Sequence, residues 1–246
     1  TEQAGAEIGL TWSVPSANGS PITGYLIERS TTSAVAGFTN LVADTGSTTA
    51  SYTDGVTNNL VIGTEYWYRI SAINIVGTGL TSTADSTVAG DRPAQISVIS
   101  ATAQAGQEIL VAWTAPADNS YAISSYLIQV SPDQQTWTTA GSSTTASFTD
   151  QSLAIGSTYY YRVHATNSLG DSDKSGIVNA LAGDVPAQTT GLTTTVLSDT
   201  QIRLNWTAPA DNSYTISGYK IERSTDNVTF SIVVADTQST ATLHTD

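Results

Sequence analysis

The sequence contains no cysteine and no methionine, and only 8 of its 246 residues are lysine or arginine. Without cysteine, the chain has no disulfide to stabilise it and no thiolate for catalysis or metal binding. No apolar run approaches the ~20 residues that a membrane-spanning helix needs, and no signal-peptide pattern is present. We therefore expect no membrane insertion in this segment, and any export signal to have been cleaved or to lie outside it.

The scarcity of basic residues also excludes a class of partner. Against 8 basic residues stand 21 acidic ones, which gives a formal net charge of −13. Binding to DNA or RNA requires Lys and Arg to displace counterions from the phosphates, and no cluster of basic residues occurs in this chain. Nucleic-acid binding is therefore not expected.

A sustained helical spacing of apolar residues is also missing, whereas strand formers are abundant. Thr, Val, Ile and Tyr suit pleated, half-buried strands. Near the start of the chain, Ile8, Leu10 and Trp12 alternate with polar residues or glycine, which is typical of a strand with one buried face. A chain of this length has room for two or three small domains.

The same segment occurs three times. In each occurrence a Trp is followed by Pro three residues later and by Tyr 13 residues later, at Trp12, Trp113 and Trp206 and at Tyr25, Tyr126 and Tyr219. Further on, residues 63–70 match residues 156–163 at a shift of 93, and the joints at residues 90–95 and 183–188 keep that shift. The repeat predicts three domains: copy 1 (residues 1–90), copy 2 (91–183) and copy 3 (184–246).

One longer pattern is more specific. Residues 60–74 and 153–167 both read Leu-x-x-Gly-x-x-Tyr-x-Tyr-Arg-x-x-Ala-x-Asn. Together with the Trp and Tyr-x-Ile strands, this pattern resembles fibronectin type III domains. The resemblance implies an all-β fold of tandem seven-stranded, immunoglobulin-like β-sandwiches, in which Tyr66 and Tyr159 bond the backbone just upstream as tyrosine corners. By alignment, copy 1 lacks strand A and copy 3 lacks the last two strands.

The strand alternation and the resemblance together predict the structural core. Its aromatic members are expected to be Trp12, Tyr25, Tyr66, Tyr68, Trp113, Tyr126, Tyr159, Tyr161, Trp206 and Tyr219.

The sequence gives no support for catalysis. The two histidines are His164, expected on the outward face of its strand, and His244, which takes the place of Tyr52 and Phe148 in the other copies. Neither lies in a recognised catalytic or metal-binding spacing. We interpret both as structural and predict that the chain is not an enzyme.

Metal binding has weak candidates. Asp118 and Asp211 lie in the loop after the Trp strand, and Asp91 and Asp184 lie at the joints. Acidic joints between modules can provide the oxygen ligands that calcium requires. Asp is also an ordinary turn former, and we favour that interpretation. No cofactor is expected otherwise.

Glycan contacts have two kinds of candidate. Trp67, Tyr160, Trp137 and Tyr121 are aromatics predicted to lie outside the core or near loops, where packing or assembly is favoured over sugar stacking. Asn18, Asn205 and Asn227 begin glycosylation sequons, and of these Asn18 and Asn227, predicted to lie in loops, are the candidate acceptors.

The sequence favours a structural or adhesive protein of the cell surface or extracellular space, of prokaryotic type. Its modules would act as rigid spacers joined by short segments containing Pro93 or Pro186, and as subunits of a surface filament or layer. The expected partners are other copies of the chain, other surface proteins or glycans. Two alternatives stay open: accessory linker modules of a secreted polysaccharide-degrading enzyme, and a viral tail fibre.

Overall fold

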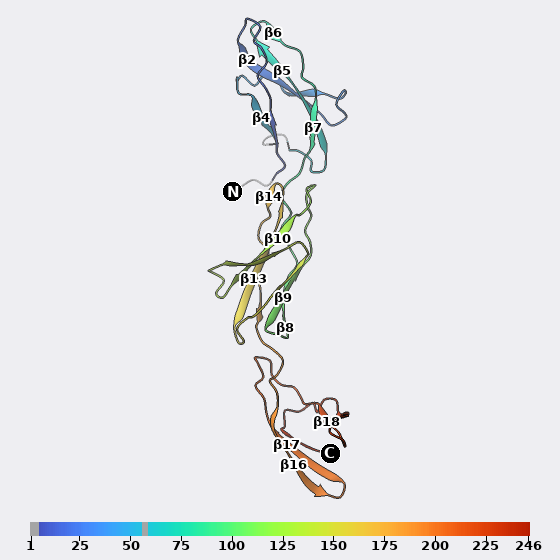
Figure 1. Cartoon of the computed structure of the whole chain (residues 1–246). Coiled ribbons are helices and arrows are strands. Elements are labelled where there is room, and N and C mark those ends of the chain that lie inside the picture. The colour runs from blue at the N-terminus through green and yellow to red at the C-terminus, as the bar shows by residue number, and fades with distance from the viewer. Residues whose placement is uncertain (1–4, 56–58) are drawn as a thin grey trace. The chain divides into compact units, whose positions relative to one another are not determined.

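The computed structural model describes residues 5–55 and 59–246, and all regular structure in these residues is β (Figure 1). Within the same residues, no helix has the length and apolar character needed to cross a membrane. The expectation of an all-β fold is confirmed. Its strands group into sheets that follow the three sequence copies.

Copy 1 contains a two-stranded sheet and a five-stranded sheet. In the five-stranded sheet the order is β3-β2-β5-β6, with β7 also paired to β5. The strands are β1 (Ile8–Thr11), β2 (Ile22–Ser30), β3 (Thr39–Val42), β4 (Ser51–Asp54), β5 (Glu65–Asn74), β6 (Gly77–Thr78) and β7 (Asp85–Val88).

Copy 2 repeats this arrangement and adds one strand. A three-stranded sheet has the order β12-β9-β8, and a five-stranded sheet has the order β11-β10-β13-β14, with β15 paired to β13. The strands are β8 (Ile99–Gln104), β9 (Glu108–Trp113), β10 (Ser125–Ser131), β11 (Thr138–Ser143), β12 (Ser147–Asp150), β13 (Thr158–Asn167), β14 (Gly170–Asp171) and β15 (Val178–Leu181). Among the described residues of copy 1, no strand pairs with β1 as β8 pairs with β9.

Copy 3 has one three-stranded sheet, β16-β17-β20, and one pair, β18-β19. The strands are β16 (Thr190–Ser198), β17 (Gln201–Thr207), β18 (Ile221–Arg223), β19 (Ser231–Val234) and β20 (Leu243–Thr245). Up to residue 246, the described chain contains no counterpart of β13 or β15.

The strand register places the copies in the same alignment as the sequence does. Leu10 pairs with Tyr52, Val111 with Phe148 and Leu204 with His244, each two residues before the repeated Trp. His244 therefore occupies the position of the two aromatics, as predicted from the repeat.

The cores of copies 1 and 2 are built from inward-facing residues, which alternate with outward-facing residues along each strand. In copy 1, the buried cluster joins Ile8 and Ile27 to Tyr66 and Tyr68, with Leu10 and Trp12 packed against it. In copy 2, Ile109, Val111, Ile128, Val163 and Ala165 are completely buried. The period of two that the sequence shows is therefore the period of burial.

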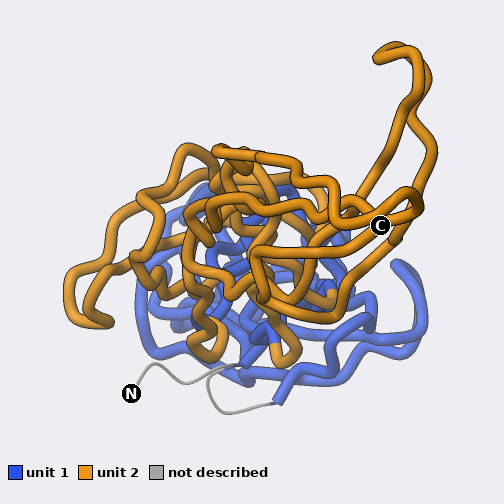
Figure 2. Tube along the Cα trace, turned by 90° about the horizontal axis from the view of Figure 1, so that it is seen from below, with its two compact units in different colours: residues 1–96, 115–126, 164–174 blue, residues 97–114, 127–163, 175–246 orange. Residues whose placement is uncertain are grey.

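Contacts between residues divide the chain into two compact units, which are coloured separately in Figure 2. Unit 1 is Thr1–Ile96 with Ala115–Tyr126 and His164–Lys174, and unit 2 is the remainder. The first joint, around residue 91, therefore lies within unit 1, and the second joint, around residue 184, lies within unit 2.

Candidate functional site

The first joint is closed by hydrogen bonds from the loop that follows β9. Backbone N–H groups of Asp91 and Ala94 donate to the carbonyls of Asn119 and Ala117, at 3.1 and 2.9 Å. The Asn119 side-chain amide donates to the Arg92 carbonyl at 2.7 Å. All three contacts come from Ala117 and Asn119, so a single loop holds the segment.

The second joint repeats these contacts 93 residues later. Asp184 N–H donates to Asn212 O at 3.1 Å and Ala187 N–H donates to Ala210 O at 2.9 Å. The Asn212 side-chain amide donates to Val185 O at 2.7 Å. Because the loop sequence is nearly the same in both copies, the same turn geometry recurs, with Asn119 and Asn212 both at positive φ.

A tyrosine from the same loop covers each joint. Tyr121 donates its hydroxyl proton to Val88 O at 3.1 Å, and Tyr214 donates to Leu181 O at 2.8 Å. Each ring lies against a glycine, and a Cβ placed on Gly90 or Gly183 would overlap the ring of its tyrosine. These two positions must therefore be glycine for the ring to approach the backbone.

The four aspartates proposed as weak metal ligands serve as turn formers in the structure. Asp91 and Asp118 each accept a hydrogen bond from a nearby backbone N–H, of Arg92 at 2.7 Å and of Ser120 at 3.1 Å. Asp211 accepts one from Ser213 N–H at 3.2 Å. Within residues 5–55 and 59–246, no three carboxylate, imidazole or thiol groups gather as a metal site would require.

Asp184 has the most extensive bonding of the four. Its Oδ1 accepts hydrogen bonds from Gly106 N–H at 2.8 Å and from Val185 N–H at 2.7 Å. These bonds to Gly106 and Val185 hold the pKa of Asp184 below its usual value. The carboxylate thus links the β8–β9 turn to the second joint within unit 2.

The tyrosine corners are present in both copies that contain the motif. Tyr66 Oη accepts a hydrogen bond from Val61 N–H at 3.0 Å, and Tyr159 Oη accepts one from Ala154 N–H at 3.2 Å. Both acceptors lie five residues after their donors, which is the upstream backbone contact that the family resemblance implied.

A buried carboxylate closes the core of copy 1. Asp54 is completely buried and accepts hydrogen bonds from the Arg29 guanidinium and the Tyr68 hydroxyl, both at 2.8 Å. Burial, and then the bond to Asp54, raise the pKa of Tyr68 well above its usual value. Copy 3 repeats the ion pair between Arg223 and Asp246 at 2.8 Å.

Copy 2 keeps only part of this arrangement. Tyr161 donates to Asp150 at 3.0 Å, whereas the position of Arg29 is taken by Val130. The Asp-Tyr contact is therefore common to copies 1 and 2, and the Arg-Asp ion pair to copies 1 and 3.

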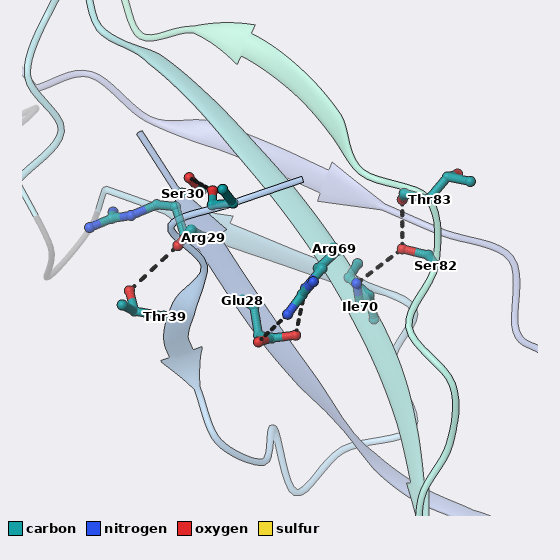
Figure 3. A network of polar contacts seen from close by, with 9 residues as sticks. Glu28, Arg29, Ser30, Thr39, Arg69, Ile70, Ser82 and Thr83 are labelled. Carbon is teal, nitrogen blue, oxygen red and sulfur yellow. Dashed lines mark hydrogen bonds and ion pairs between the residues drawn. The ribbon is translucent and has the colours of Figure 1, made fainter. Parts of the chain in front are cut away.

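The outer face of the larger sheet carries a repeated arginine stack. In copy 1, Arg69 on β5 binds both carboxylate oxygens of Glu28 on β2, at 2.8 and 2.9 Å (Figure 3). The Arg69 guanidinium also lies 4.2 Å from the Phe38 ring centroid. In copy 2, Arg162 binds Gln129 at 2.8 Å and lies 4.1 Å from the Trp137 ring centroid.

This stack bears on the aromatics considered for sugar contacts. The guanidinium of Arg162 occupies one face of Trp137, and Tyr121 is engaged at the joint. Trp67 and Tyr160 are half-buried, opposite Ser86 and Asn179 on the neighbouring strands. Trp137 and Tyr121 therefore have identified protein contacts, and Trp67 and Tyr160 are partly covered.

The predicted core aromatics differ in burial between copies. Six of them are buried, with at most 7% of the residue exposed: Tyr25, Tyr66, Tyr68, Trp113, Tyr126 and Tyr161. Four are half-buried: Trp12, Tyr159, Trp206 and Tyr219. In copy 3, the described residues include no strand opposite Trp206 and Tyr219 comparable to β13, so these two remain partly open.

His164 is buried, so the predicted outward, exposed position of its side chain is wrong. The residue is only 7% exposed, and its Nε2 lies 3.6 Å from Asp171 Oδ2. Asp171 also accepts a hydrogen bond from the Thr166 hydroxyl at 2.6 Å. His164 alternates along β13 with Val163 and Ala165, and both faces of the strand are covered at this point.

The two candidate glycosylation acceptors are exposed. Asn18 and Asn227 both lie in turns with positive φ, 47° and 58°. Asn205, by contrast, lies within β17 and is paired on both sides, with Thr193 and with Leu243. The sequons at Asn18 and Asn227 are therefore accessible, whereas the sequon at Asn205 lies inside a sheet.

Sequence reasoning did not single out the residues that hold the joints. Gly90 and Gly183 lie in the repeated joints and Asn119 and Asn212 in the loops after the Trp strands, and both pairs are identical at a shift of 93. This identity between the copies could have indicated the contacts, because loop residues need to be the same in two copies only where they make the same contacts.

Comparison with known proteins agrees with this architecture. A family model described as "Fibronectin type III domain" matches residues 1–88 and 92–180. Human "Receptor-type tyrosine-protein phosphatase F" is 30% identical over 225 residues, which cover 85% of this chain and 11% of that protein. "Exoglucanase B" of Cellulomonas fimi is 23% identical over 239 residues, covering 90% of this chain and 20% of that protein.

Solved structures with similar folds include several tandem arrays. "Crystal structure of chicken CNTN1 FN1-FN3 domains" aligns with 99% of this chain and 85% of that chain, at 21% identity and a TM-score of 0.42. Domains A168–A170 of titin align with 72% of this chain and 67% of that chain, at 16% identity and a TM-score of 0.46. The chain thus spans only a small part of the curated relatives that it matches, and it belongs to the fibronectin type III family.

Proposed function

We propose that this chain is a non-catalytic, extracellular scaffold of fibronectin type III modules that acts as a stiff spacer and as a structural or adhesive element of a surface. The module boundaries are those of the sequence repeat, residues 1–90, 91–183 and 184–246. The observation that carries the proposal is the repeated joint, in which one loop holds the incoming segment through backbone, asparagine and tyrosine contacts.

The contacts favour a spacer because each joint is fixed at several points. A joint with no side-chain contacts bends freely, since inter-domain motion is the default for modules with small interfaces. Here Pro93 and Pro186 restrict φ, and Tyr121 and Tyr214 add a hydrogen bond across each joint. The charge of −13 and the exposed Ser and Thr keep such a chain dispersed in water.

The spacer proposal can be tested with spin labels, because the chain has no cysteine of its own that would also be labelled. Spin labels on Thr48→Cys and Thr144→Cys, both exposed loop positions, report the distance between copies 1 and 2 by pulsed electron resonance. We expect a narrow distance distribution that broadens when Gly90→Ala displaces the Tyr121 ring. A distribution that is equally broad with and without this substitution contradicts the spacer proposal.

A second candidate rests on the similarity to the bacterial exoglucanase. In that reading the modules are accessory linkers of a secreted polysaccharide-degrading enzyme, which also fits a prokaryotic source. The measurement is retention of the chain on insoluble cellulose or chitin, with bovine serum albumin as the control. Retention above the control favours glycan binding by these modules. If the chain is not retained above the control, the spacer role is favoured.

The expected partners are further copies of this chain or other surface proteins. The edge strand β16 supports this proposal, because all nine of its residues are exposed and none is charged. No charged side chain on this strand opposes pairing with another strand.

A further inference from the structure

The loop after β1 contains the only asparagine of the sequence that is followed by glycine, Asn18-Gly19. The two residues have φ of 47° and 90°, and Ser20 N–H donates to Ala17 O at 3.1 Å. These values describe a type I′ turn with Asn18 and Gly19 at its centre. Both central residues are exposed, so water and base can reach them.

An exposed Asn-Gly pair carries both reactants of a cyclisation in neighbouring residues. The backbone nitrogen that follows an asparagine can attack the side-chain amide carbon Cγ and close a succinimide ring, because the chain already holds the two atoms close together. Glycine favours this step, since it has no Cβ to crowd the nitrogen or to restrict the rotation that brings it to Cγ. The nitrogen gives up its proton to a base, which requires that the N–H is accessible.

Copies 2 and 3 have an asparagine at the same point of the loop, but there the following nitrogen is held. In copy 2, Asn119 is followed by serine, and Ser120 N–H donates to Asp118 Oδ1 at 3.1 Å. Copy 3 repeats this contact between Ser213 N–H and Asp211 Oδ1 at 3.2 Å. The hydrogen bond fixes the nitrogen, and the negative charge of the carboxylate opposes the loss of its proton. Both turns are therefore protected against the cyclisation.

In copy 1 the residues around the asparagine differ in ways that favour the reaction. Ala17 takes the place of Asp118, so Gly19 N–H lacks the carboxylate partner. Ser16 stands where copies 2 and 3 have alanine, and its hydroxyl donates to Asn18 Oδ1 at 3.0 Å. A donor on this oxygen stabilises the negative charge that develops there as the nitrogen attacks Cγ. All of these differences lie within the loop itself and do not depend on any segment that precedes β1.

We propose that Asn18 is a site of spontaneous deamidation. The Gly19 nitrogen loses its proton to a base and forms a bond to Asn18 Cγ, and the side-chain nitrogen leaves as ammonia. Water then opens the succinimide ring: addition at Cγ gives an aspartate, and addition at the backbone carbonyl gives an isoaspartate. One water is consumed and one ammonia is released, and no residue is oxidised or reduced. The inference holds whether or not the modules act as a spacer.

The reaction changes both the charge and the glycosylation sequon of this loop. It replaces a neutral amide by a carboxylate, so the formal net charge of −13 becomes more negative by one. It also removes the acceptor nitrogen of the sequon Asn18-Gly19-Ser20, so that glycosylation and deamidation exclude each other at this residue. Asn227, the other accessible sequon, is followed by valine and should keep its amide. An isoaspartate also adds a methylene group to the main chain within the turn.

The test follows the whole chain during incubation in mildly alkaline buffer. Peptide mass spectrometry measures the replacement of NH₂ by OH at each asparagine, and enzymatic methylation identifies the isoaspartate. We expect Asn18 to convert at least about tenfold faster than Asn119 and Asn212, because glycine and the free N–H both lower the barrier. The rate at Asn18 should rise with pH, since the attacking nitrogen must lose a proton. Conversion at Asn18 no faster than at the other two overturns the proposal.

Variants that restore the residues of the other copies make the outcome specific. Gly19→Ser and Ala17→Asp should each slow conversion by about threefold or more. The turn accommodates serine, because Ser120 and Ser213 have φ of 74° and 78°. Gly9→Ser is the matched control: Gly9 is exposed on β1, an added Cβ there meets no atom within 4 Å, and the rate should not change. An unchanged rate in both loop variants, or equal slowing by the control, overturns the proposal. The readout is independent of the joint distances that test the spacer role.

Discussion

At the residue scale, the same amino acid in the same motif has different environments in different copies. Trp113 is 7% exposed, and Trp206, at the same point of the repeat, is half-buried. The difference arises because β13 and β15 cover the core of copy 2, whereas the described residues of copy 3 include no such strands. The contribution of each Trp to the free energy of unfolding should therefore increase with its burial.

Substituting Trp113 with Ala should lower the free energy of unfolding of copy 2 by about 3–5 kcal/mol, because it removes a large buried side chain and leaves a cavity. Trp206→Ala should cost clearly less, since part of that ring already contacts water. Chemical denaturation followed by circular dichroism measures both. Equal effects would contradict the ranking by burial.

The buried carboxylate of copy 1 gives a second prediction. Asp54 has no side-chain exposure, and its partner Arg29 is 25% exposed. Breaking a buried ion pair by removing one partner costs about 3–5 kcal/mol, and partial exposure of the arginine reduces this. We expect Arg29→Met to destabilise copy 1 by about 2–3 kcal/mol in equilibrium unfolding.

A matched control is available in copy 3. Arg203 is exposed on β17, and Arg203→Met should change stability by no more than about 0.5 kcal/mol. If Arg29→Met proves equally mild, Asp54 does not depend on its charged partner.

At the element scale, the loops after the Trp strands do more than connect strands. In copies 2 and 3, the loop presents two backbone carbonyls, an asparagine amide and a tyrosine to the segment that enters the copy. The loop can do this because Asn and the following Ser adopt positive φ, which exposes consecutive polar groups on one side of the turn.

Adding one methyl group at a joint should loosen it. In Gly90→Ala the new Cβ would overlap the Tyr121 ring and approach Asn119 O at 2.7 Å, and in Gly183→Ala it would meet Tyr214. We expect each variant to increase protease cleavage at its own joint while the cores stay folded. Gly5→Ala, where a Cβ meets no atom within 4 Å, should behave as the unmodified chain.

The turn after β18 gives a prediction on pH. Asp226 accepts hydrogen bonds from Thr229 N–H, Ser224 Oγ–H and Val228 N–H, and these bonds lower its pKa. A lowered folded-state pKa contributes stability that is present above the unfolded value of about 3.9 and is lost as pH falls through the folded value. Asp133 occupies the same position in copy 2, with its pKa lowered chiefly by Thr136 N–H.

We therefore expect carboxyl NMR titrations of Asp226 and Asp133 to have midpoints below about 3.9. The Asp226→Asn variant should lose part of its acid-dependent destabilisation. A midpoint at the ordinary value would show that the turn does not favour the charged carboxylate.

At the scale of the whole molecule, charge and strand edges have opposite effects on association. A charge of −13 separates chains in solution, whereas the uncharged edge strand β16 can pair with another strand. Screening by salt weakens the repulsion without altering the backbone groups of the edge.

Self-association should therefore increase between low salt and about 1 M salt, as measured by sedimentation velocity. Thr194→Lys places a charge in the middle of β16 and should reduce the effect, while Thr48→Lys in an exposed loop should not. Chains that stay monomeric at all salt concentrations would remove β16 as an assembly edge.

The sequence by itself determined the repeat, the strand alternation and the positions of the tyrosine corners, because these depend on local spacing and on residues near one another in the chain. Only the tertiary structure decided how deeply each aromatic is buried, that His164 is covered, and that Gly90 and Gly183 receive tyrosine rings. Burial and close approach depend on segments distant in sequence. The alternation of residues along a strand shows on which face of the sheet a side chain lies. Which other segments cover that face depends on how the sheets pack.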